Sequence, residues 1–147
     1  MSKSTVVLFL LSCLPFYSNA QQVFSNNKYP LVDFRSPLDI KPPALSGSFG
    51  EIRANHFHSG LDYRTNQREG YPVYAIADGY ISRIRVQNSG FGLAAYINHP
   101  NGYTSVYGHL QRFNAKIASH METRQYEQKT FELDEFPLEG MIPVRKG

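Results

Sequence analysis

Short strand-like segments joined by tight turns constrain the fold of this chain more than any other feature. Four such segments follow one another, at residues 71–77, 80–86, 93–98 and 103–109. Asp78-Gly79 and Pro100-Asn101-Gly102 stand between them, and Asp-Gly and Asn-Gly pairs are typical of β-hairpin turns. Because so short a connection cannot make a parallel crossover, the sequence predicts an antiparallel meander.

The side-chain pattern supports a sheet with one buried face. Ile84 and Val86 alternate with Arg83 and Arg85, so the apolar pair is expected on one face and the basic pair on the other. After the meander, residues 131–135 alternate as a short edge strand.

Only one stretch has the pattern of a helix. Asn114 is a suitable N-cap, and Ile117 and Met121 are spaced to lie on one face of a helix that runs to about Gln128. We therefore expect a mainly β protein with an antiparallel sheet and one peripheral helix.

Composition excludes several classes of protein. The 147 residues are 41% hydrophobic and include ten Tyr and ten Phe, which is enough for the core of one domain and too much for a disordered chain. The single cysteine, Cys13, excludes a disulfide scaffold. The net charge of +3 is scattered without a Lys/Arg run, so no nucleic-acid partner is expected.

The first twenty residues have the pattern of an export signal. Lys3 precedes a short apolar run, and Ser18-Asn19-Ala20 offers the small residues at which a signal peptidase cuts. The run is too short for a membrane-spanning helix, so no integral membrane span is expected in the mature chain. A lipoprotein signal that ends at Cys13 and a buried N-terminal strand are the alternatives. The prediction is a signal peptide over residues 1–20 and export to the periplasm or the extracellular space.

Cleavage before Gln21 also limits the chemistry of the mature protein. Because cleavage removes Cys13, any metal site has to come from His, Asp and Glu. Residues 21–44 are polar and rich in proline, and we expect them to form an extended arm on the surface of a domain that covers residues 45–147.

His58 and Asp62 form the first candidate site. In a straight strand they would lie roughly 13 Å apart, so they share a metal ion only if the chain bends at Gly60. Imidazole and carboxylate are both good zinc ligands. The alternative is a surface histidine near a turn and a capping aspartate.

A polar strand face that ends at His109 forms the second candidate. Alternation places Tyr103, Ser105, Tyr107 and His109 on one face, which suits the floor of a substrate groove. A solvent-exposed sheet face is the alternative.

Several motifs, taken in order, carry a resemblance to a known family. They are His58-Ser59-Gly60-Leu61-Asp62, Gly70-Tyr71-Pro72-Val73-Tyr74-Ala75, Ala77-Asp78-Gly79, Gly90-Phe91-Gly92, His99-Pro100-Asn101-Gly102-Tyr103 and Tyr107-Gly108-His109-Leu110. Over residues 47–113 the chain resembles the LytM-type zinc peptidases, peptidase family M23. The resemblance implies an open, β-barrel-like antiparallel fold and secreted or periplasmic cleavage of the peptide cross-links of peptidoglycan.

The resemblance also implies roles for individual residues. His58 and Asp62 match the first two zinc ligands, and His109 matches a histidine that assists the reaction without binding the metal. The third ligand of the family belongs to a later H-x-H motif, and no such motif follows His109. His56-Phe57-His58 also fits the pattern H-x-H, but it precedes Asp62 and so does not match the later motif. No role is assigned to His120. We expect a C-terminally truncated, inactive fragment of a zinc metallopeptidase, with a natural terminus as the alternative.

A second function from another class stays open. Because only two ligands are present, the chain is alternatively a zinc-free LytM-like module that binds the cell wall or activates an amidase. A sugar-transport phosphocarrier barrel is a weaker rival, against which the export signal argues.

The remaining polar residues are expected to be structural. His99 and Asp78 are expected to shape turns. The acidic residues after the helix are expected to form a solvated insertion or a groove rim, and they are Glu132, Asp134, Glu135 and Glu139. Arg64 and Arg68 are interpreted as loop charges or as contacts for a muropeptide carboxylate.

Overall fold

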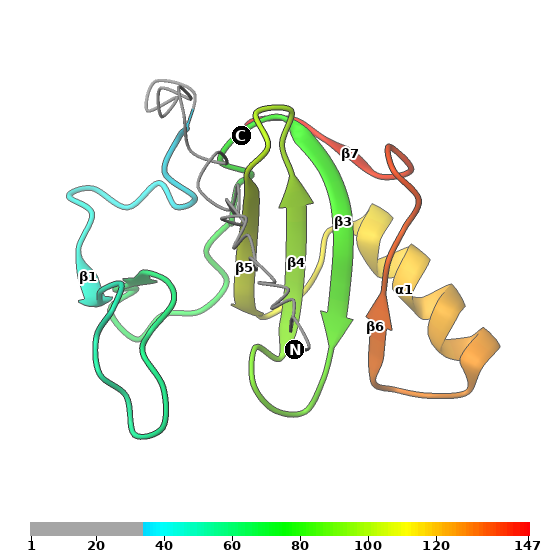
Figure 1. Cartoon of the computed structure of the whole chain (residues 1–147), viewed down its shortest axis with the longest axis horizontal. Coiled ribbons are helices and arrows are strands. Elements are labelled where there is room, and N and C mark those ends of the chain that lie inside the picture. Colours follow the sequence, from blue (N-terminus) through cyan, green and yellow to red (C-terminus); the bar gives the residue numbers. More distant parts are fainter. Residues whose placement is uncertain (1–33) are drawn as a thin grey trace, which may run out of the picture.

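The computed structural model describes residues 34–147, which form a mainly β structure with one helix (Figure 1). The predicted signal peptide and the first part of the predicted arm lie outside the described residues. Within residues 34–147, no helix is long and apolar enough to cross a membrane. The division of the chain at residues 20 and 44 stays a prediction.

The main sheet is an antiparallel meander extended by two short strands. Its strands are β3 (Gly79–Val86), β4 (Leu93–Asn98), β5 (Thr104–Leu110), β6 (Leu133–Glu135) and β7 (Pro143–Val144). The order is β5-β4-β3-β6, and β7 pairs with β3 beside β6. The predicted mainly β, antiparallel fold is confirmed, and the described part forms open sheets without a closed barrel.

The predicted strand at residues 71–77 is wrong, because that segment is irregular, ends in a bend and belongs to no sheet. Its backbone groups find other partners. The N–H of Tyr74 donates to the carbonyl of Pro37 at 2.9 Å, and the N–H of Ile76 donates to the phenol of Tyr107 at 2.9 Å. Because these groups are already paired, the segment does not need a strand ladder.

The predicted hairpin turn at Asp78-Gly79 is also wrong, because the strand before it is absent. The predicted turn at Pro100-Asn101-Gly102 is confirmed. Asp78 lies in a bend that leads directly into β3, with no strand before it. Residues 99–103 close the turn between β4 and β5, where the N–H of His99 donates to the carbonyl of Tyr103 at 2.9 Å.

The core lies between one face of the main sheet and the helix α1 (Ala115–Gln128). Ile81 and Ile84 are fully buried, although a spacing of three would place them on opposite faces of a regular strand. The register of β3 and β4 shifts between Ile81 and Arg83, which indicates a bulge with one extra residue on β3. The bulge turns Ile81 and Ile84 to the same face.

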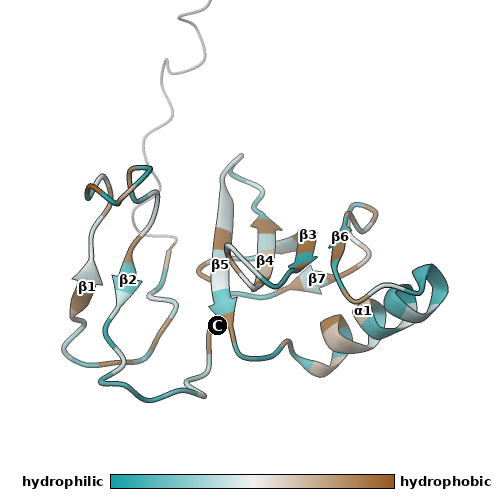
Figure 2. Ribbon diagram, turned by 90° about the horizontal axis from the view of Figure 1, so that it is seen from below, coloured by the Kyte–Doolittle hydropathy of each residue, from teal (hydrophilic) through white to brown (hydrophobic). Residues whose placement is uncertain are grey.

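The helix begins and ends where the sequence predicts. The side chain of Asn114 accepts a 3.0 Å hydrogen bond from the N–H of Ile117, as an N-cap does. Ile117 and Met121 are buried against the core of the sheet. Figure 2 shows α1 along one face of the main sheet.

A small second sheet lies beside the β5 edge of the main sheet (Figure 2). It pairs β1 (Leu45–Gly47) with β2 (Asp62–Tyr63), antiparallel. The chain between these two strands folds into a hairpin closed by a bridge between Ile52 and Phe57. This small sheet carries the first candidate site.

Candidate metal centre

The structure brings His58 and Asp62 together. Nε2 of His58 lies 3.2 Å from Oδ1 of Asp62, in place of the roughly 13 Å of a straight strand. The N–H of Gly50 donates to the carbonyl of His58, and the N–H of His58 donates to Glu51, so the hairpin fixes the backbone of His58. The chain then bends at Gly60, as predicted, and returns through β2.

A backbone contact sets the orientation of the His58 ring. Nδ1 lies 2.9 Å from the carbonyl oxygen of Ser48, and a carbonyl only accepts, so Nδ1 carries a hydrogen. In the neutral ring, Nε2 of His58 therefore directs its lone pair at Asp62. In the doubly protonated ring, Nε2 directs an N–H group at Asp62 instead. Two acceptors 3.2 Å apart need a positive species between them, either a proton or a metal ion. A ring nitrogen held by a carbonyl is also the usual outer contact of a metal-ligating histidine.

The spacing of these two donors fits a zinc ion. Ligands at about 2.0–2.1 Å in tetrahedral geometry lie about 3.3 Å from one another, close to the observed 3.2 Å. Among residues 34–147, no group of three or more His, Cys, Asp and Glu side chains is placed to hold a metal. The described part therefore offers two donors to a metal.

The other oxygen of Asp62 is bound by an arginine. Nη2 of Arg53 lies 2.8 Å from Oδ2 of Asp62, and Nε of Arg53 lies 3.6 Å from Glu51. Gly47 is the register partner of Asp62 in the small sheet, and it lies against the same contact. Arg53 thus contacts one oxygen of the Asp62 carboxylate, and His58 contacts the other.

His109 does not lie where strand alternation places it. In the register of β4 and β5, Ala95 pairs with Tyr107 and Leu93 pairs with Leu110, so β5 carries one extra residue between these pairs. Leu110 therefore takes the core-facing position after Tyr107, and His109 is exposed with a φ of 54°. The predicted common face holds for Ser105 and Tyr107 and is wrong for His109.

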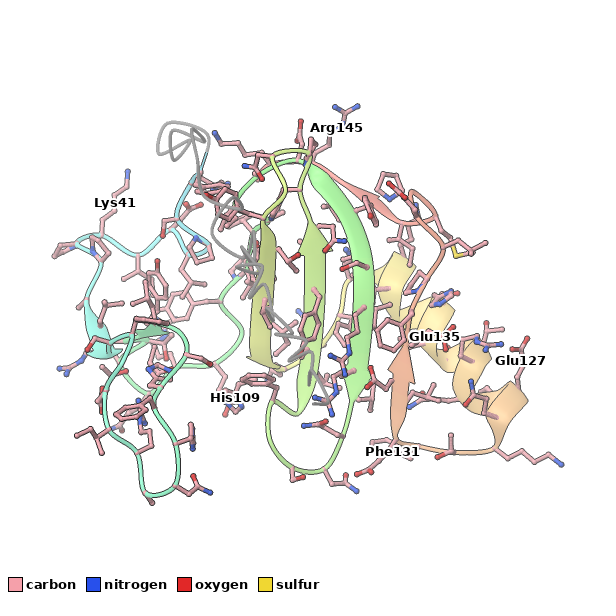
Figure 3. All side chains as sticks on the ribbon, in the orientation of Figure 1. Lys41, His109, Glu127, Phe131, Glu135 and Arg145 are labelled. Carbon is pink, nitrogen blue, oxygen red and sulfur yellow. The ribbon has the colours of Figure 1, made fainter. Side chains whose placement is uncertain are left out.

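His109 instead stands at the end of β5, on the side that faces the small sheet (Figure 3). Its N–H donates to the carbonyl of Phe91 at 2.8 Å, and the two rings meet edge to face with centroids 6.2 Å apart. A Cβ on Gly108 would lie 3.0 Å from the Phe91 ring, so glycine allows this ring to approach the strand. His109 does not join His58 and Asp62 in a three-residue metal group within residues 34–147.

The hydroxyl groups expected on a groove floor are instead engaged in an internal network. Ser105 Oγ lies 3.0 Å from the Tyr107 phenol oxygen and 2.8 Å from Nε2 of His99. Nδ1 of the buried His99 donates to the carbonyl of Asp78 at 2.8 Å. His99 and Asp78 are therefore structural, as the sequence predicts.

Three of the four acidic residues near the helix are exposed, as expected of a solvated insertion, and Asp134 and Glu135 also form ion pairs. Asp134 accepts two hydrogen bonds from the guanidinium of Arg83, and this lowers the pKa of Asp134 from its usual value, with the charge of Arg85 adding to the effect. Glu135 accepts a 3.0 Å hydrogen bond from Arg124 and lies 3.9 Å from His120. These residues stabilise the contact between β6, β3 and α1.

Three residues of the site were not predicted from the sequence, and they are Arg53, Gly47 and Phe91. Arg53 has no spacing signal toward Asp62, because the hairpin alone brings the two together. Phe91 and Gly108 are both part of motifs that carried the resemblance, but a motif does not show that the ring lies against His109.

Comparisons with known proteins agree with the motifs. The family model for peptidase family M23 matches residues 56–126, which contain His58, Asp62 and His109. A 57-residue segment is 42% identical to the DD-carboxypeptidase/endopeptidase Mpg of Neisseria meningitidis, covering 39% of this chain and 13% of that protein. A 98-residue segment is 34% identical to the peptidoglycan DD-endopeptidase ShyC of Vibrio cholerae, covering 62% of this chain and 21% of that protein.

A third relative is an uncharacterized metalloprotease of Haemophilus influenzae, which is 33% identical over 86 residues. These residues are 58% of this chain and 17% of that protein. The chain thus spans about a fifth or less of the length of these relatives. No solved structure matches the chain. The family match over residues 56–126 and these relatives together confirm the predicted resemblance to peptidase family M23.

Proposed function

We propose that this chain is part of a zinc-dependent endopeptidase that hydrolyses the peptide cross-links of bacterial peptidoglycan. The observation that carries the proposal is the pairing of His58 Nε2 with Asp62 Oδ1 at 3.2 Å, inside the segment that matches the family. The printed names of two relatives, a DD-carboxypeptidase/endopeptidase and a peptidoglycan DD-endopeptidase, support this substrate.

Each candidate residue has a distinct part in the proposed reaction. His58 and Asp62 would hold the ion, and a bound zinc ion supplies Lewis acidity and a water molecule that ionises near neutral pH. Ser48 keeps Nε2 of His58 available by holding the hydrogen on Nδ1. His109, exposed at the end of β5, would donate a proton or a hydrogen bond to the oxygen that becomes negative.

The activity is proposed for the whole protein and not for these 147 residues alone. Catalytic zinc has three protein ligands, and residues 34–147 group only two. We propose that the 147-residue chain by itself is inactive and binds zinc weakly. Because peptidoglycan lies outside the cytoplasm, the proposal also requires export, in agreement with the predicted signal peptide.

The test compares histidine variants of the full-length protein. Zinc content is measured by elemental analysis, and activity is measured as release of muropeptides from purified sacculi. His58→Ala should lose both, whereas His56→Ala, a change at an exposed neighbour, should lose neither. His109→Ala should keep zinc and lose activity.

Two outcomes would contradict the proposal. Unchanged muropeptide release from the His58→Ala protein would eliminate the site. A wild-type protein that binds sacculi or stimulates an amidase, without bound zinc and without cutting peptides, would support the wall-binding or activating module instead.

A further inference from the structure

We infer that Arg53 is a positioning residue, which fixes the Asp62 carboxylate so that only Oδ1 faces His58. We infer also that Gly47 is required for this contact. The inference rests on the proposed function, because it concerns how the same carboxylate is presented to a metal.

The contact between Arg53 and Asp62 divides the carboxylate into two different oxygens. Nη2 of Arg53 lies 2.8 Å from Oδ2, and Oδ1 lies 3.2 Å from Nε2 of His58. A carboxylate can bind a metal through one oxygen or through both. With Oδ2 held by a guanidinium, Oδ1 is the oxygen that is turned toward Nε2 of His58 and is thus positioned to bind a metal beside it.

The hairpin explains why Arg53 reaches Asp62 across nine positions. Its N–H donates to the carbonyl of His56 at 2.9 Å, and the bridge between Ile52 and Phe57 closes the hairpin around it. Nε of Arg53 is buried without a hydrogen-bond partner among the described residues and lies 3.6 Å from Glu51, so the 2.8 Å contact with Asp62 is the shorter of its two ionic contacts.

Gly47 provides the space for this contact. A Cβ at Gly47 would overlap Oδ2 of Asp62 and would lie 2.5 Å from Nη2 of Arg53. Gly47 is buried and is paired with Asp62 across the small sheet, so the backbone has little freedom to retreat. A side chain here would therefore displace the guanidinium, the carboxylate or both from their present positions.

Two effects of Arg53 on metal binding oppose each other. Its positive charge repels a cation, whereas its hydrogen bond orients the ligand in advance. The side chains of Arg53 and Asp62 are 36% and 42% exposed, so water and salt weaken the repulsion. Loss of an outer contact to a metal ligand usually weakens metal binding by about 10-fold to 100-fold. We therefore expect orientation to outweigh repulsion.

The experiment is a Zn²⁺ titration of the 147-residue chain, followed by competition with a chromophoric chelator. Arg53→Met should weaken Zn²⁺ binding by about 10-fold or more. Arg53→Lys, which keeps a charged donor, should recover part of the loss. Arg64→Met is the matched control: it removes an exposed charge two positions after Asp62 and should leave the affinity unchanged.

Gly47→Ala gives an independent approach to the same contact. It should weaken Zn²⁺ binding as Arg53→Met does, and the double variant should be no weaker than either single variant, because both remove one interaction. Circular dichroism melting of each variant confirms that it is folded. Equal or tighter binding by Arg53→Met, or additive losses in the double variant, would overturn the inference.

A metal-free measurement separates this inference from the proposed function. In a crystal structure of metal-free Arg53→Met, Oδ1 of Asp62 should turn away from Nε2 of His58, and an unchanged carboxylate would overturn the inference. If the wild-type chain binds no Zn²⁺, its two donors do not hold the ion by themselves, and this crystal structure alone decides the role of Arg53.

Discussion

The phenol oxygen of Tyr107 accepts a 2.9 Å hydrogen bond from the backbone N–H of Ile76, which lies 31 positions earlier in the chain. This contact ties an irregular segment without strand partners to the edge strand β5 of the main sheet. It also replaces the ladder hydrogen bond that a strand at residues 71–77 would have made.

Tyr107→Phe should therefore destabilise the protein. The change leaves the N–H of Ile76 without its acceptor and takes a partner from Ser105, and an unsatisfied group in a partly buried place costs about 1–3 kcal/mol. Urea denaturation followed by circular dichroism measures the loss. Tyr126→Phe is the control, since Tyr126 is 77% exposed. Equal stability of both variants would contradict the role given to this phenol.

Ile84→Ala tests the position of the core. Ile84 is completely buried and pairs with Ala95 in β4 and with Glu135 in β6, so its removal leaves a cavity between sheet and helix. The expected loss in the free energy of unfolding is about 2–5 kcal/mol. Val106→Ala, at a position that is 47% exposed, should cost about 0.5 kcal/mol or less. A similar cost at both positions would place the core elsewhere.

Asp134→Asn tests the ion pair between β3 and β6 through pH. The hydrogen bonds from Arg83 lower the pKa of Asp134 in the folded chain, so the folded state favours the ionised carboxylate. This stabilisation is present above the unfolded pKa of about 3.9 and is lost as pH falls through the lower, folded value.

The variant should accordingly be less stable than the wild type at pH 7, and the difference should shrink as pH falls below the unfolded pKa of Asp134 and vanish below its lower, folded pKa. Thermal midpoints across this range measure it, with the exposed Glu122→Gln as control. High salt should reduce the difference at pH 7, because the Asp134 side chain is 41% exposed. A difference that persists at low pH would show that the charge is not responsible.

Zinc should stabilise the chain through the proposed pair. A ligand that binds only the folded state adds about 1.4 kcal/mol at ten times its dissociation constant. The melting temperature should rise with added Zn²⁺ and return to its starting value with EDTA. The rise should be absent in His58→Ala and present in His56→Ala. A rise of equal size in both variants would show that Zn²⁺ binds at another place.

Much of the fold follows from local sequence. Strand β4 and helix α1 lie where alternation and the Asn114 cap predict them, because each is set by neighbours along the chain. The segment at residues 71–77 misled the prediction, because a strand pattern does not show whether a partner strand exists. Its partners are Pro37 and Tyr107, which no local rule connects to it.

The candidate site was predictable in part, for the same reason. The glycine bend that joins His58 to Asp62 is a local feature, and the sequence shows it. The displacement of His109 depends on a bulge, which shows itself only in the register between β4 and β5. The contact of Arg53 with Asp62 depends on how a hairpin lies against a strand, and residue spacing carries no signal of that.

Two short strands pair with the same edge of strand β3, one at each end of it. This arrangement affects how the hydrogen bonds of β3 break. Strand β7 pairs with Gly79 and Tyr80, and strand β6 pairs with residues 84–86. Strands β6 and β7 follow one another in the chain and pair with different ends of β3. Either strand is therefore able to detach while the other stays paired. Amide hydrogen exchange along this single strand should therefore report two separate opening events, with the slower one at Ile84, where the helix covers the sheet.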